Sequence, residues 1–374
     1  MAETFLLKHI LSPRLIEVMG RNIKSVYLEF DALGFSEASV SQLDGLALKQ
    51  RAIMIAEKLH EYLPNHYPAA IEILMQTMDV ELVDEDNLGR YNEFYFLPFA
   101  EFIAAYGLNH LPESVLAMNK LTKVFTSEFC IRPFIQRYPA EMMRILSEWV
   151  CDDNKHVRRL VSEGTRTRLP WAGRLPEFQA NPQPVLDLLE KLKQDPELYV
   201  RRSVANNLND IAKDNPDIVI QTLIRWNKID DEGTQYIVRH ASRTLIKAGH
   251  PEALVLLGFD PKSPIELLDF KVDGLVQFGG KLKFEFKIQN TDSKAHDYVI
   301  DFVIYFKKAN GNQAPKVFKL NSKRLKAGEV LYVQKTHPIK PISTRKYYNG
   351  MQSLAIQVNG LELAIADFEL KGVG

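Results

Sequence analysis

The sequence predicts a multidomain α + β protein in which an all-α repeat solenoid is followed by a β-sandwich. Up to about residue 258, apolar residues recur every three or four positions, as in LALKQRAIMIAEKLHEYL and VLDLLEKLKQ. This is the period of an amphipathic helix. After Phe270 the period changes to two, as in KLKFEFKIQN and LELAIADFEL, which is typical of strands. A chain of 374 residues is long enough for two domains, each with its own core.

The helical part contains an internal repeat. Three segments, HVRRLVSEG, YVRRSVANN and IVRHASRTL, align Arg158 with Arg201 and Arg239, which follow one another after 43 and 38 residues. This length is typical of HEAT-like repeats, whose helix pairs must stack because one pair cannot bury its apolar face alone. Stacking leaves a concave groove, and we expect a residue at a recurring position to line it. Alternatively, these arginines make hydrogen bonds between repeats.

The second part is expected to form an immunoglobulin-like β-sandwich. Its alternating segments are KLKFEFKIQN, YVIDFVIYFKK, VLYVQKTHPI, LAIQVNG and LELAIADFEL. Asn-Gly pairs at Asn310 and Asn359, and the AGE tripeptide around Gly328, supply residues that suit hairpin turns. The size fits such a sandwich, although the Cys…Trp…Cys pattern of antibody domains is absent. We therefore predict domains at residues 1–258 and 265–374, joined by the linker GFDPKSPIE.

Charge is distributed unevenly along a chain that has none overall. The 47 basic and 47 acidic residues balance, which excludes a uniformly basic binder of polyanions. The densest basic stretch is VRRLVSEGTRTRLPWAGRLP. Its five arginines lie on both sides of Glu163, four of them before Trp171 and one after it. These arginines are Arg158, Arg159, Arg166, Arg168 and Arg174. Guanidinium groups bind phosphates bidentately and an indole offers a flat face for a base or sugar, so the stretch predicts a clamp for a phosphate backbone.

Several other kinds of chemistry lack support in the sequence. No GxGxxG follows a predicted strand, and GxxxxGK[ST], GxSxG and HExxH are absent. The scattered histidines and the VDEDN segment lack the spacing of a metal site, so no metal is predicted. Cys130 and Cys151 are expected to be small core residues in a reducing compartment. Since no long apolar stretch and no secretory signal are found, we expect a cytoplasmic protein with no membrane partner.

Glu128 is the first of three carboxylates that the sequence singles out. In TSEFCIRPFIQRYP, Arg132 and Gln136 follow it at four-residue steps, which predicts one polar face on a helix. Thr126 and Ser127 are good helix-cap residues, so Glu128 is alternatively a first-turn acid that interacts favourably with the helix dipole.

Glu163 and Asp210 are the other two carboxylates. Glu163 ends its predicted helix directly before Gly164, a candidate C′ glycine, and an acid at this end is unfavourable unless arginines or a cationic ligand compensate it. Asp210 ends a polar face begun by Arg202 and Asn206. Acids repel a DNA backbone, and they suit a site that meets a cationic lesion or an oxocarbenium-like sugar.

Four segments together resemble a known family. FLPFAEFIAAYG, TSEFCIRPFIQRYP, HVRRLVSEGTRTRLPWAGRLP and YVRRSVANNLNDIAKDNP occur in the order found in the AlkC branch of the AlkC/AlkD-type bacterial alkylpurine DNA glycosylases. The similarity covers most of residues 1–258. It implies a HEAT-like solenoid with a positively charged DNA groove, and the strand-rich tail is similar to the immunoglobulin-like domain that some AlkC members carry.

The resemblance also implies an activity. Members of this family are monofunctional glycosylases that hydrolyse the N-glycosidic bond of cationic N3-alkylated bases such as 3-methyladenine and 3-methylcytosine. They act on duplex DNA, need no metal or organic cofactor, and leave the lesion in the duplex instead of extruding it. This agrees with the lack of an aromatic-rich pocket signature in the sequence. The implied setting is a monomer that is associated with the nucleoid in a bacterial cytoplasm.

By the same resemblance, Glu128, Glu163 and Asp210 match the acidic active-site positions of the family, and Trp171 matches the aromatic residue near the sugar of the lesion. Glu163 and Asp210 would stabilise the oxocarbenium ion and position water, whereas Glu128 would support the water or hold an arginine. The expected DNA-binding residues are Trp171, Arg158, Arg159, Arg166, Arg168, Arg201, Arg202 and Arg239.

Other readings of the same groove remain open. One alternative is a non-catalytic HEAT-repeat scaffold that binds nucleic acid, and another is a binder directed to RNA. In the second domain, basic residues are expected in or beside loops, where they either contact phosphates or form a solubilising surface. They are Lys307, Lys308, Lys316, Lys323, Arg324 and Lys326, with Arg345 and Lys346 near a further turn.

Overall fold

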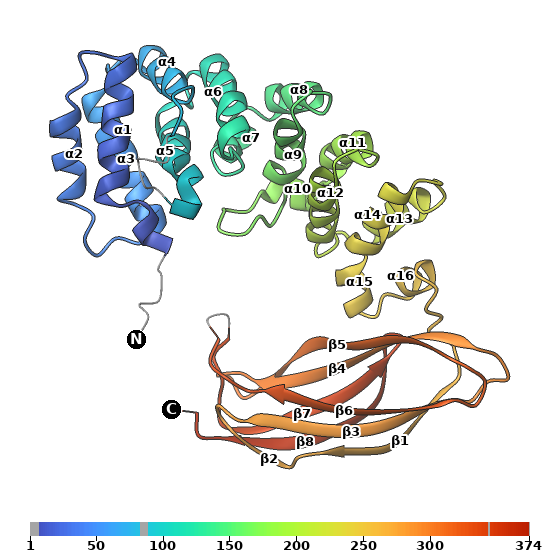
Figure 1. Ribbon diagram of the computed structural model, residues 1–374. Helices are drawn as coiled ribbons and strands as arrows, with labels where there is room; N and C mark the ends of the chain where they lie inside the picture. Colours follow the sequence, from blue (N-terminus) through green and yellow to red (C-terminus); the bar gives the residue numbers. More distant parts are fainter. Residues whose placement is uncertain (1–6, 83–88, 343–344, 374) are drawn as a thin grey trace. The chain divides into compact units, whose positions relative to one another are not determined.

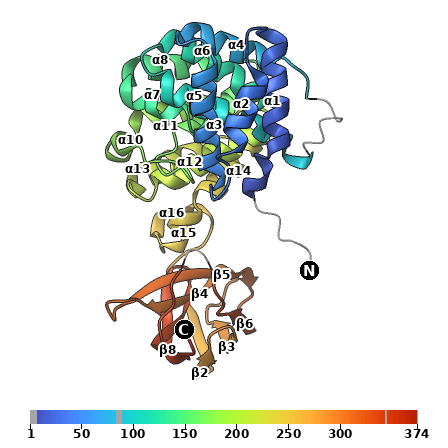
Figure 2. The same ribbon diagram turned by 90° about the vertical axis from the view of Figure 1, so that its left-hand side faces the viewer.

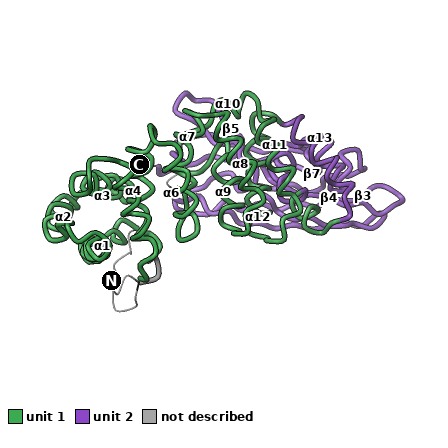
Figure 3. The backbone as a smooth tube through the Cα atoms, turned by 90° about the horizontal axis from the view of Figure 1, so that it is seen from above, with its two compact units in different colours: residues 1–215, 231–237 green, residues 216–230, 238–374 purple. Residues whose placement is uncertain are grey.

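The structure is a computed structural model that describes residues 7–82, 89–342 and 345–373 (Figure 1). The VDEDN segment lies outside these residues. The chain divides into two compact units, one made of residues 1–215 and 231–237 and the other of residues 216–230 and 238–374 (Figure 3). The predicted domain limits at 258 and 265 stay a prediction.

Helices build the first unit, as the periodicity predicts. They are η1 (Leu7–Ile10), α1 (Pro13–Val26), α2 (Ala32–Val40), α3 (Leu48–Tyr62), α4 (Tyr67–Thr77), η3 (Gly89–Phe96), α5 (Leu97–Tyr106), α6 (Leu111–Val124), α7 (Ile131–Arg137), α8 (Pro139–Trp149), α9 (Lys155–Gly164), α10 (Pro176–Ala180), α11 (Gln183–Leu192), α12 (Leu198–Ile211) and the start of α14 (Glu232–Ala241). Neighbouring helices such as α1, α2 and α3 lie side by side (Figure 2). Helix α9 contacts α6, α8, α11 and α12. None of the described helices is long and apolar enough to cross a bilayer.

Polar turns start the repeat helices. The backbone N–H of His156 donates to the side chain of Asn154 at 2.8 Å, and that of Thr234 donates to Asp231 at 2.6 Å. Both bonds satisfy amides that a helix leaves unpaired at its first turn. The polar CDDNK and DDEGTQ segments thus cap the starts of α9 and α14.

The recurring arginines do not all share one position. Arg158 and Arg201 are each the fourth residue of their helices, α9 and α12. Arg239 is the eighth residue of α14, one turn further along. The prediction of one common register is therefore wrong for Arg239, because α14 begins seven residues before its arginine, whereas α9 and α12 begin three residues before theirs.

The described residues of the second unit form three helices and two sheets. The helices are α13 (Pro216–Trp226), α15 (Arg243–Lys247) and α16 (Pro251–Leu256), and the last residues of α14 belong here too. The strands are β1 (Ile265–Val272), β2 (Leu275–Gln277), β3 (Lys281–Asn290), β4 (His296–Lys307), β5 (Gln313–Leu325), β6 (Val330–Pro338), β7 (Gly350–Val358) and β8 (Leu361–Lys371). One sheet has the order β1-β3-β6 and the other the order β2-β8-β7-β4-β5. The predicted sandwich is confirmed.

Alternating apolar side chains fill the space between the two sheets. Phe284 and Phe286 of β3 and Phe302 and Ile304 of β4 are buried at alternate positions of their strands. The rings of Phe284 and Phe302 lie 5.0 Å apart between centroids and join the sheets. The period of two that the sequence shows is thus the period of one common core.

Turn residues of the sandwich behave partly as predicted. Asn359 and Gly360 both have positive φ, 45° and 80°, which fits the tight hairpin between β7 and β8. Gly311, with φ 82°, turns the chain between β4 and β5. Gly328 also has positive φ, but β5 and β6 belong to different sheets, so this turn is not a hairpin.

Two further expectations need correction. Lys316, Lys323 and Arg324 are residues of strand β5; Lys323 and Arg324 lie beside the loop that follows its end at Leu325, whereas Lys316 lies within the strand. This strand is at the edge of its sheet, where lysines discourage pairing with another chain and mask the apolar alternation that would have revealed a strand. Cys130 is buried as expected, whereas Cys151 is exposed at the end of α8 and is not a core residue.

A buried carboxylate makes the stability of the second unit depend on pH. Asp301 of β4 is 2% exposed and lies opposite Lys319 of β5 and Gln357 of β7. Burial raises the pKa of Asp301 to about 6, although Lys319 and Lys247 act in the opposite direction. Because the folded state binds this proton more tightly than the unfolded chain does, ionisation of Asp301 destabilises the fold.

We expect the stabilisation that the protonated Asp301 gives to the fold to be lost as the pH rises from about 4 to about 6. Asp301→Asn should raise the free energy of unfolding near neutral pH by about 1–3 kcal/mol, because no charge is left to bury. Denaturant unfolding of the full chain at both ends of the pH range measures this. Asp297→Asn, at an exposed carboxylate paired with Arg324, is the control. Equal stability of Asp301→Asn and the parent chain near neutral pH would contradict the assignment.

Candidate active site

Two arginines link the three predicted carboxylates into one chain of alternating charge. Arg159 places Nη1 2.5 Å from Glu128 Oε2 and Nη2 3.4 Å from Glu163 Oε1. Arg166 places Nη1 2.6 Å from the same Glu163 oxygen and Nε 2.8 Å from Asp210 Oδ2. These five side chains, linked in the order Glu128, Arg159, Glu163, Arg166 and Asp210, form the acid–arginine chain. It joins the turn before α7 to α9, the loop after α9, and α12.

Burial makes these pairings strong. Glu163 and Asp210 are 5% and 3% exposed, and a carboxylate at that depth is costly unless it is paired and hydrogen-bonded. Ser203 Oγ donates to Glu163 Oε2 at 2.6 Å, and Lys213 Nζ donates to Asp210 Oδ1 at 2.8 Å. Two guanidinium groups and one ammonium group thus face three carboxylates. This confirms that neighbouring arginines compensate an acid at the end of α9.

The charge of Arg166 is held in place by its partners. Burial would lower the pKa of Arg166, but the carboxylates of Glu163 and Asp210 outweigh it and raise that pKa above its ordinary value. The guanidinium therefore stays protonated in the physiological range. Among the described residues, no three His, Cys, Asp or Glu side chains are grouped as metal ligands would be.

Glu128 reaches this chain from a turn, not from a helix. The first residue of α7 is Ile131, so Glu128 precedes the helix by three residues. Its carboxylate accepts hydrogen bonds from Thr126 Oγ1 at 3.2 Å and from Arg159. The predicted polar helix face shared with Arg132 and Gln136 is therefore wrong, because the helix starts after Glu128.

Gly164 also differs from its predicted role. It is the last residue of α9, and its φ is not positive, so it is not a left-handed C′ glycine. A Cβ atom at this position would lie 2.8 Å from Cγ2 of Ile131. The glycine therefore permits close approach of α9 to α7.

Arg158 and Arg201 are engaged within the first unit. Arg158 Nε donates to Asp195 at 2.6 Å, and its Nη1 donates to the carbonyl of Asp152 at 2.8 Å. Arg201 Nη1 donates to the carbonyls of Asp195 and Pro196 at 2.5 and 2.9 Å. Arg158 thus ties the turn before α9 to the turn before α12, as the alternative interpretation of the repeat predicts. These bonds of Arg201 stay within the turn before its own helix.

The other predicted DNA-binding arginines differ in exposure. Arg168 Nε donates to Asp214 Oδ2 at 2.9 Å, and Arg168 together with Gln179 lowers the pKa of this carboxyl group. Arg202 and Arg239 are exposed, one in each unit, and so is Arg174 after Trp171. These exposed side chains are in a position to meet phosphates from solvent.

Tyr199 is a site residue that sequence reasoning missed. The Arg159 guanidinium carbon lies 5.3 Å from the centroid of the Tyr199 ring, which is a cation–π contact. The His156 ring meets the Tyr199 ring in an edge-to-face arrangement, 5.6 Å apart between centroids. The available signal was the aromatic residue that precedes Val-Arg-Arg in both the HVRR and YVRR segments.

Trp171 projects into solvent beside the acids. It is 78% exposed, and its φ of 63° lies in the left-handed region that a tryptophan rarely adopts. A cavity of about 560 Å³ adjoins it. Its lining includes Phe94, Leu97, Phe125, Phe129, Leu169, Pro170 and Trp171, with Glu128 and Glu163. The sequence shows no signature of this aromatic lining, because the residues come from segments far apart in the chain.

Breaking the acid–arginine chain at its centre should destabilise the first unit. We expect Arg166→Met to lower the free energy of unfolding by about 2–4 kcal/mol, because Glu163 and Asp210 each lose a buried counter-charge. Urea denaturation measures the effect. Arg144→Met, which removes an exposed pair with Glu148, is the matched control and should change stability by less than about 0.5 kcal/mol. A loss no larger than that of the control would show that the chain of charges is not structural.

Comparisons with known proteins found two family models that match parts of the chain and a relative that matches 97% of it. Residues 107–245 match the family model described as DNA alkylation repair enzyme, and residues 267–372 match the model described as the C-terminal Ig-like domain of the uncharacterised protein YhaZ. YhaZ of Bacillus subtilis is 35% identical over 97% of this chain and 99% of its own length.

A solved structure is similar to this chain over nearly its whole length. The alkylpurine DNA glycosylase AlkC of Pseudomonas fluorescens, bound to DNA containing an abasic site analog, has a TM-score of 0.90 and 34% sequence identity. The match covers 98% of this chain and 100% of that one. The predicted helical repeat fold with an immunoglobulin-like domain is thus the fold of this relative. The chain belongs to the AlkC-type branch of the DNA alkylation repair enzyme family.

Proposed function

We propose that this chain is a DNA glycosylase that hydrolyses the N-glycosidic bond of cationic N3-alkylated bases, 3-methyladenine and 3-methylcytosine among them, in duplex DNA. The observation that carries the proposal is the acid–arginine chain, in which Glu128, Glu163 and Asp210 lie together beside the exposed Trp171. The AlkC relative was solved with DNA that contains an abasic site analog, which resembles the product of base removal.

The carboxylates suit a reaction that develops positive charge on the sugar. When a cationic base departs, the deoxyribose takes on oxocarbenium character, and fixed carboxylates stabilise it. The leaving group is already positive, so little general-acid assistance is needed. In this mechanism Glu163 and Asp210 stabilise the sugar and orient the attacking water. Glu128 holds Arg159, in agreement with the hydrogen bond between them.

The arginines hold the acids in a fixed orientation before the reaction begins. Arg159 and Arg166 hold Glu163 between them at 3.4 and 2.6 Å, so its carboxylate does not have to reorganise when the sugar cation forms. The same negative charges favour a cationic lesion over a neutral base. Selectivity and rate acceleration thus come from one set of side chains.

Trp171 is proposed to meet the sugar of the lesion from outside the base stack. Its indole is exposed and borders the cavity next to Glu128 and Glu163, so the ring can reach DNA that lies along this surface. We propose that the lesion stays in the duplex during bond cleavage. Exposed cations, Arg202 and Arg239 among them, would contact phosphates. The enzyme would act as a monomer in the cytoplasm, at the nucleoid.

Neutralising the acids separates this enzyme from a non-catalytic scaffold. Glu163→Gln and Asp210→Asn should each slow release of 3-methyladenine from methylated duplex by about 100-fold or more under single-turnover conditions. Glu128→Gln should have a smaller effect, because its role is to hold Arg159. Affinity for duplex DNA should stay equal or rise as negative charge is removed. Mass spectrometry of the released bases gives the rates, and fluorescence anisotropy gives the affinities.

Glu148→Gln, at an exposed carboxylate of α8, is the control for these variants. A parent chain that binds duplex DNA but releases no base would favour the scaffold. Tighter binding of RNA than of duplex DNA at matched salt would favour an RNA-directed protein, since phosphate contacts make both affinities depend on salt.

The second unit provides a test of additional phosphate contacts. We expect Lys316→Glu with Lys326→Glu, near the exposed edge of β5, to weaken duplex binding and to reduce the slope of log affinity against log salt by about 2. Anisotropy titrations at several salt concentrations measure the slope. Lys281→Glu with Lys283→Glu, on β3 of the other sheet, is the control with the same change of charge. An unchanged slope for the β5 variant would show a merely solubilising surface.

A further inference from the structure

Arg132 of α7 is a buried arginine whose hydrogen bonds all go to backbone carbonyls. It is 4% exposed. Its Nη1 donates to the carbonyls of Gly164 and Arg166 at 2.9 and 2.8 Å, and its Nη2 donates to the carbonyl of Gly173 at 2.5 Å. Within the part of the chain that the structure describes, no ion pair joins it to a carboxylate. A charge at this depth needs hydrogen-bond acceptors to offset its desolvation, and here the three backbone carbonyls supply them.

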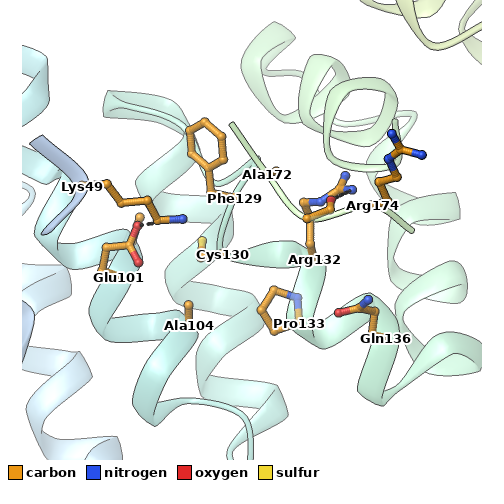
Figure 4. Close-up of a pocket in the computed structure, with 12 residues that line it drawn as sticks. Lys49, Glu101, Ala104, Phe129, Cys130, Arg132, Pro133, Gln136, Ala172 and Arg174 are labelled. Carbon is orange, nitrogen blue, oxygen red and sulfur yellow. Dashed lines mark hydrogen bonds and ion pairs between the residues drawn. The ribbon is translucent and has the colours of Figure 1, made fainter. Parts of the chain in front are cut away.

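All three carbonyls belong to the segment that carries the site. Gly164 is the last residue of α9, and α10 begins at Pro176. Arg166 is the residue whose side chain bridges Glu163 and Asp210. Gly173 follows Trp171 by two residues. One guanidinium group therefore binds both ends of the segment 164–173, and Figure 4 shows the Arg132 side chain reaching from α7 toward the part that carries Ala172 and Arg174.

The tip of this segment has little else to hold it. Trp171 is exposed, and an added Cβ at Gly173 would meet nothing within 4 Å. Two backbone bonds within the segment, from Ala172 to Leu169 and from Leu175 to Thr167, are both 3.3 Å long. The left-handed backbone at Trp171 is strained and persists only where the surroundings impose it.

The fit between α7 and α9 is what lets Arg132 reach these carbonyls. Gly164 lies against Ile131, the neighbour of Arg132, and a side chain there would push the two helices apart. Burial and the nearby Arg166 lower the pKa of Arg132 to about 10, so it stays charged at neutral pH. A planar guanidinium can donate in several directions at once, which the compact ammonium group of lysine cannot reproduce for carbonyls this far apart in the segment.

We propose that Arg132 is a positioning residue that clamps segment 164–173, so that Trp171 projects beside the carboxylates and the backbone of Arg166 stays fixed between Glu163 and Asp210. Arg132 itself does not touch the substrate in this arrangement. Its effect on base release rests on the function proposed above, whereas its effect on the segment does not.

Proteolysis of the full chain tests the clamp without DNA. Chymotrypsin cleaves after exposed aromatic residues and requires an adaptable backbone at the cut. In Arg132→Ala, cleavage after Trp171 should be faster than in the parent by about tenfold, because the tip opens locally. Low millimolar guanidinium should restore protection by filling the vacated site. Arg144→Ala, at an exposed arginine of α8, should resemble the parent with and without guanidinium.

Arg132→Lys is the second variant, because it keeps the charge and most of the stem if Arg132→Ala fails to fold. It should also be cleaved faster than the parent after Trp171, while its circular dichroism stays that of a folded chain. Protection equal to that of the parent in every folded Arg132 variant would overturn the proposal. Faster cleavage everywhere in the chain, without rescue by guanidinium, would also overturn it, since this is the result of general destabilisation.

Single-turnover release of 3-methyladenine then measures the consequence for the reaction. The rate in Arg132→Ala should fall by about tenfold while duplex affinity changes little, and guanidinium should restore the rate. In a double variant that also lacks the Trp171 ring, the fold loss in rate should be smaller than the product of the two single-variant losses, because both changes act on one element. If the parent releases no base, the proposed function fails, but the protection experiment still decides the role of Arg132.

Discussion

The alternation of buried carboxylates and guanidinium groups is the constraint on which the first unit depends. Glu163 sits at the end of α9, where the helix dipole disfavours a negative charge, and it is tolerated because Arg159 and Arg166 face it. Arg166 in turn connects to Asp210 on α12. The two helices are thus joined by charge as well as by apolar packing. Any change in their spacing would leave a buried ion without a partner, so the position of the acids is fixed by the fold itself.

This arrangement explains how a chain without net charge can present a charged site. Each acid in the site has a cation within hydrogen-bonding distance, so the cluster is balanced while its individual dipoles are rigidly oriented. Rigid orientation is what a developing sugar cation needs, because a preorganised field costs no rearrangement during the reaction. The exposed cations needed for a phosphate backbone are separate side chains. In the proposed function, positioning of the acids and attraction of the nucleic acid therefore fall to different arginines, as the contrast between the buried pairs of Arg166 and the exposed side chain of Arg202 illustrates.

Much of the fold could be predicted from the sequence, because periodicity and turn chemistry are local. The three acids were singled out through the segments that resemble the family, and the structure brings them together. The change of apolar period near residue 270 and the Asn359-Gly360 turn are examples. Properties set by tertiary contacts could not be predicted. The start of α7 left Glu128 outside a helix, the edge strand β5 was hidden by its lysines, and the aromatic cavity draws on residues from several helices. The roles of Arg132 and Tyr199 likewise depend on neighbours that are distant in the chain.

The backbone at Trp171 carries a consequence for how such a protein can change. Glycine adopts a φ of 63° without strain, whereas tryptophan does so only under restraint. Exchange for glycine would therefore relieve conformational strain at this position and remove the aromatic ring at the same time. Selection for a more robust fold and selection for retention of the ring oppose each other at one residue. A tryptophan in such a conformation is best understood as a local trade of folding stability for a precisely aimed side chain.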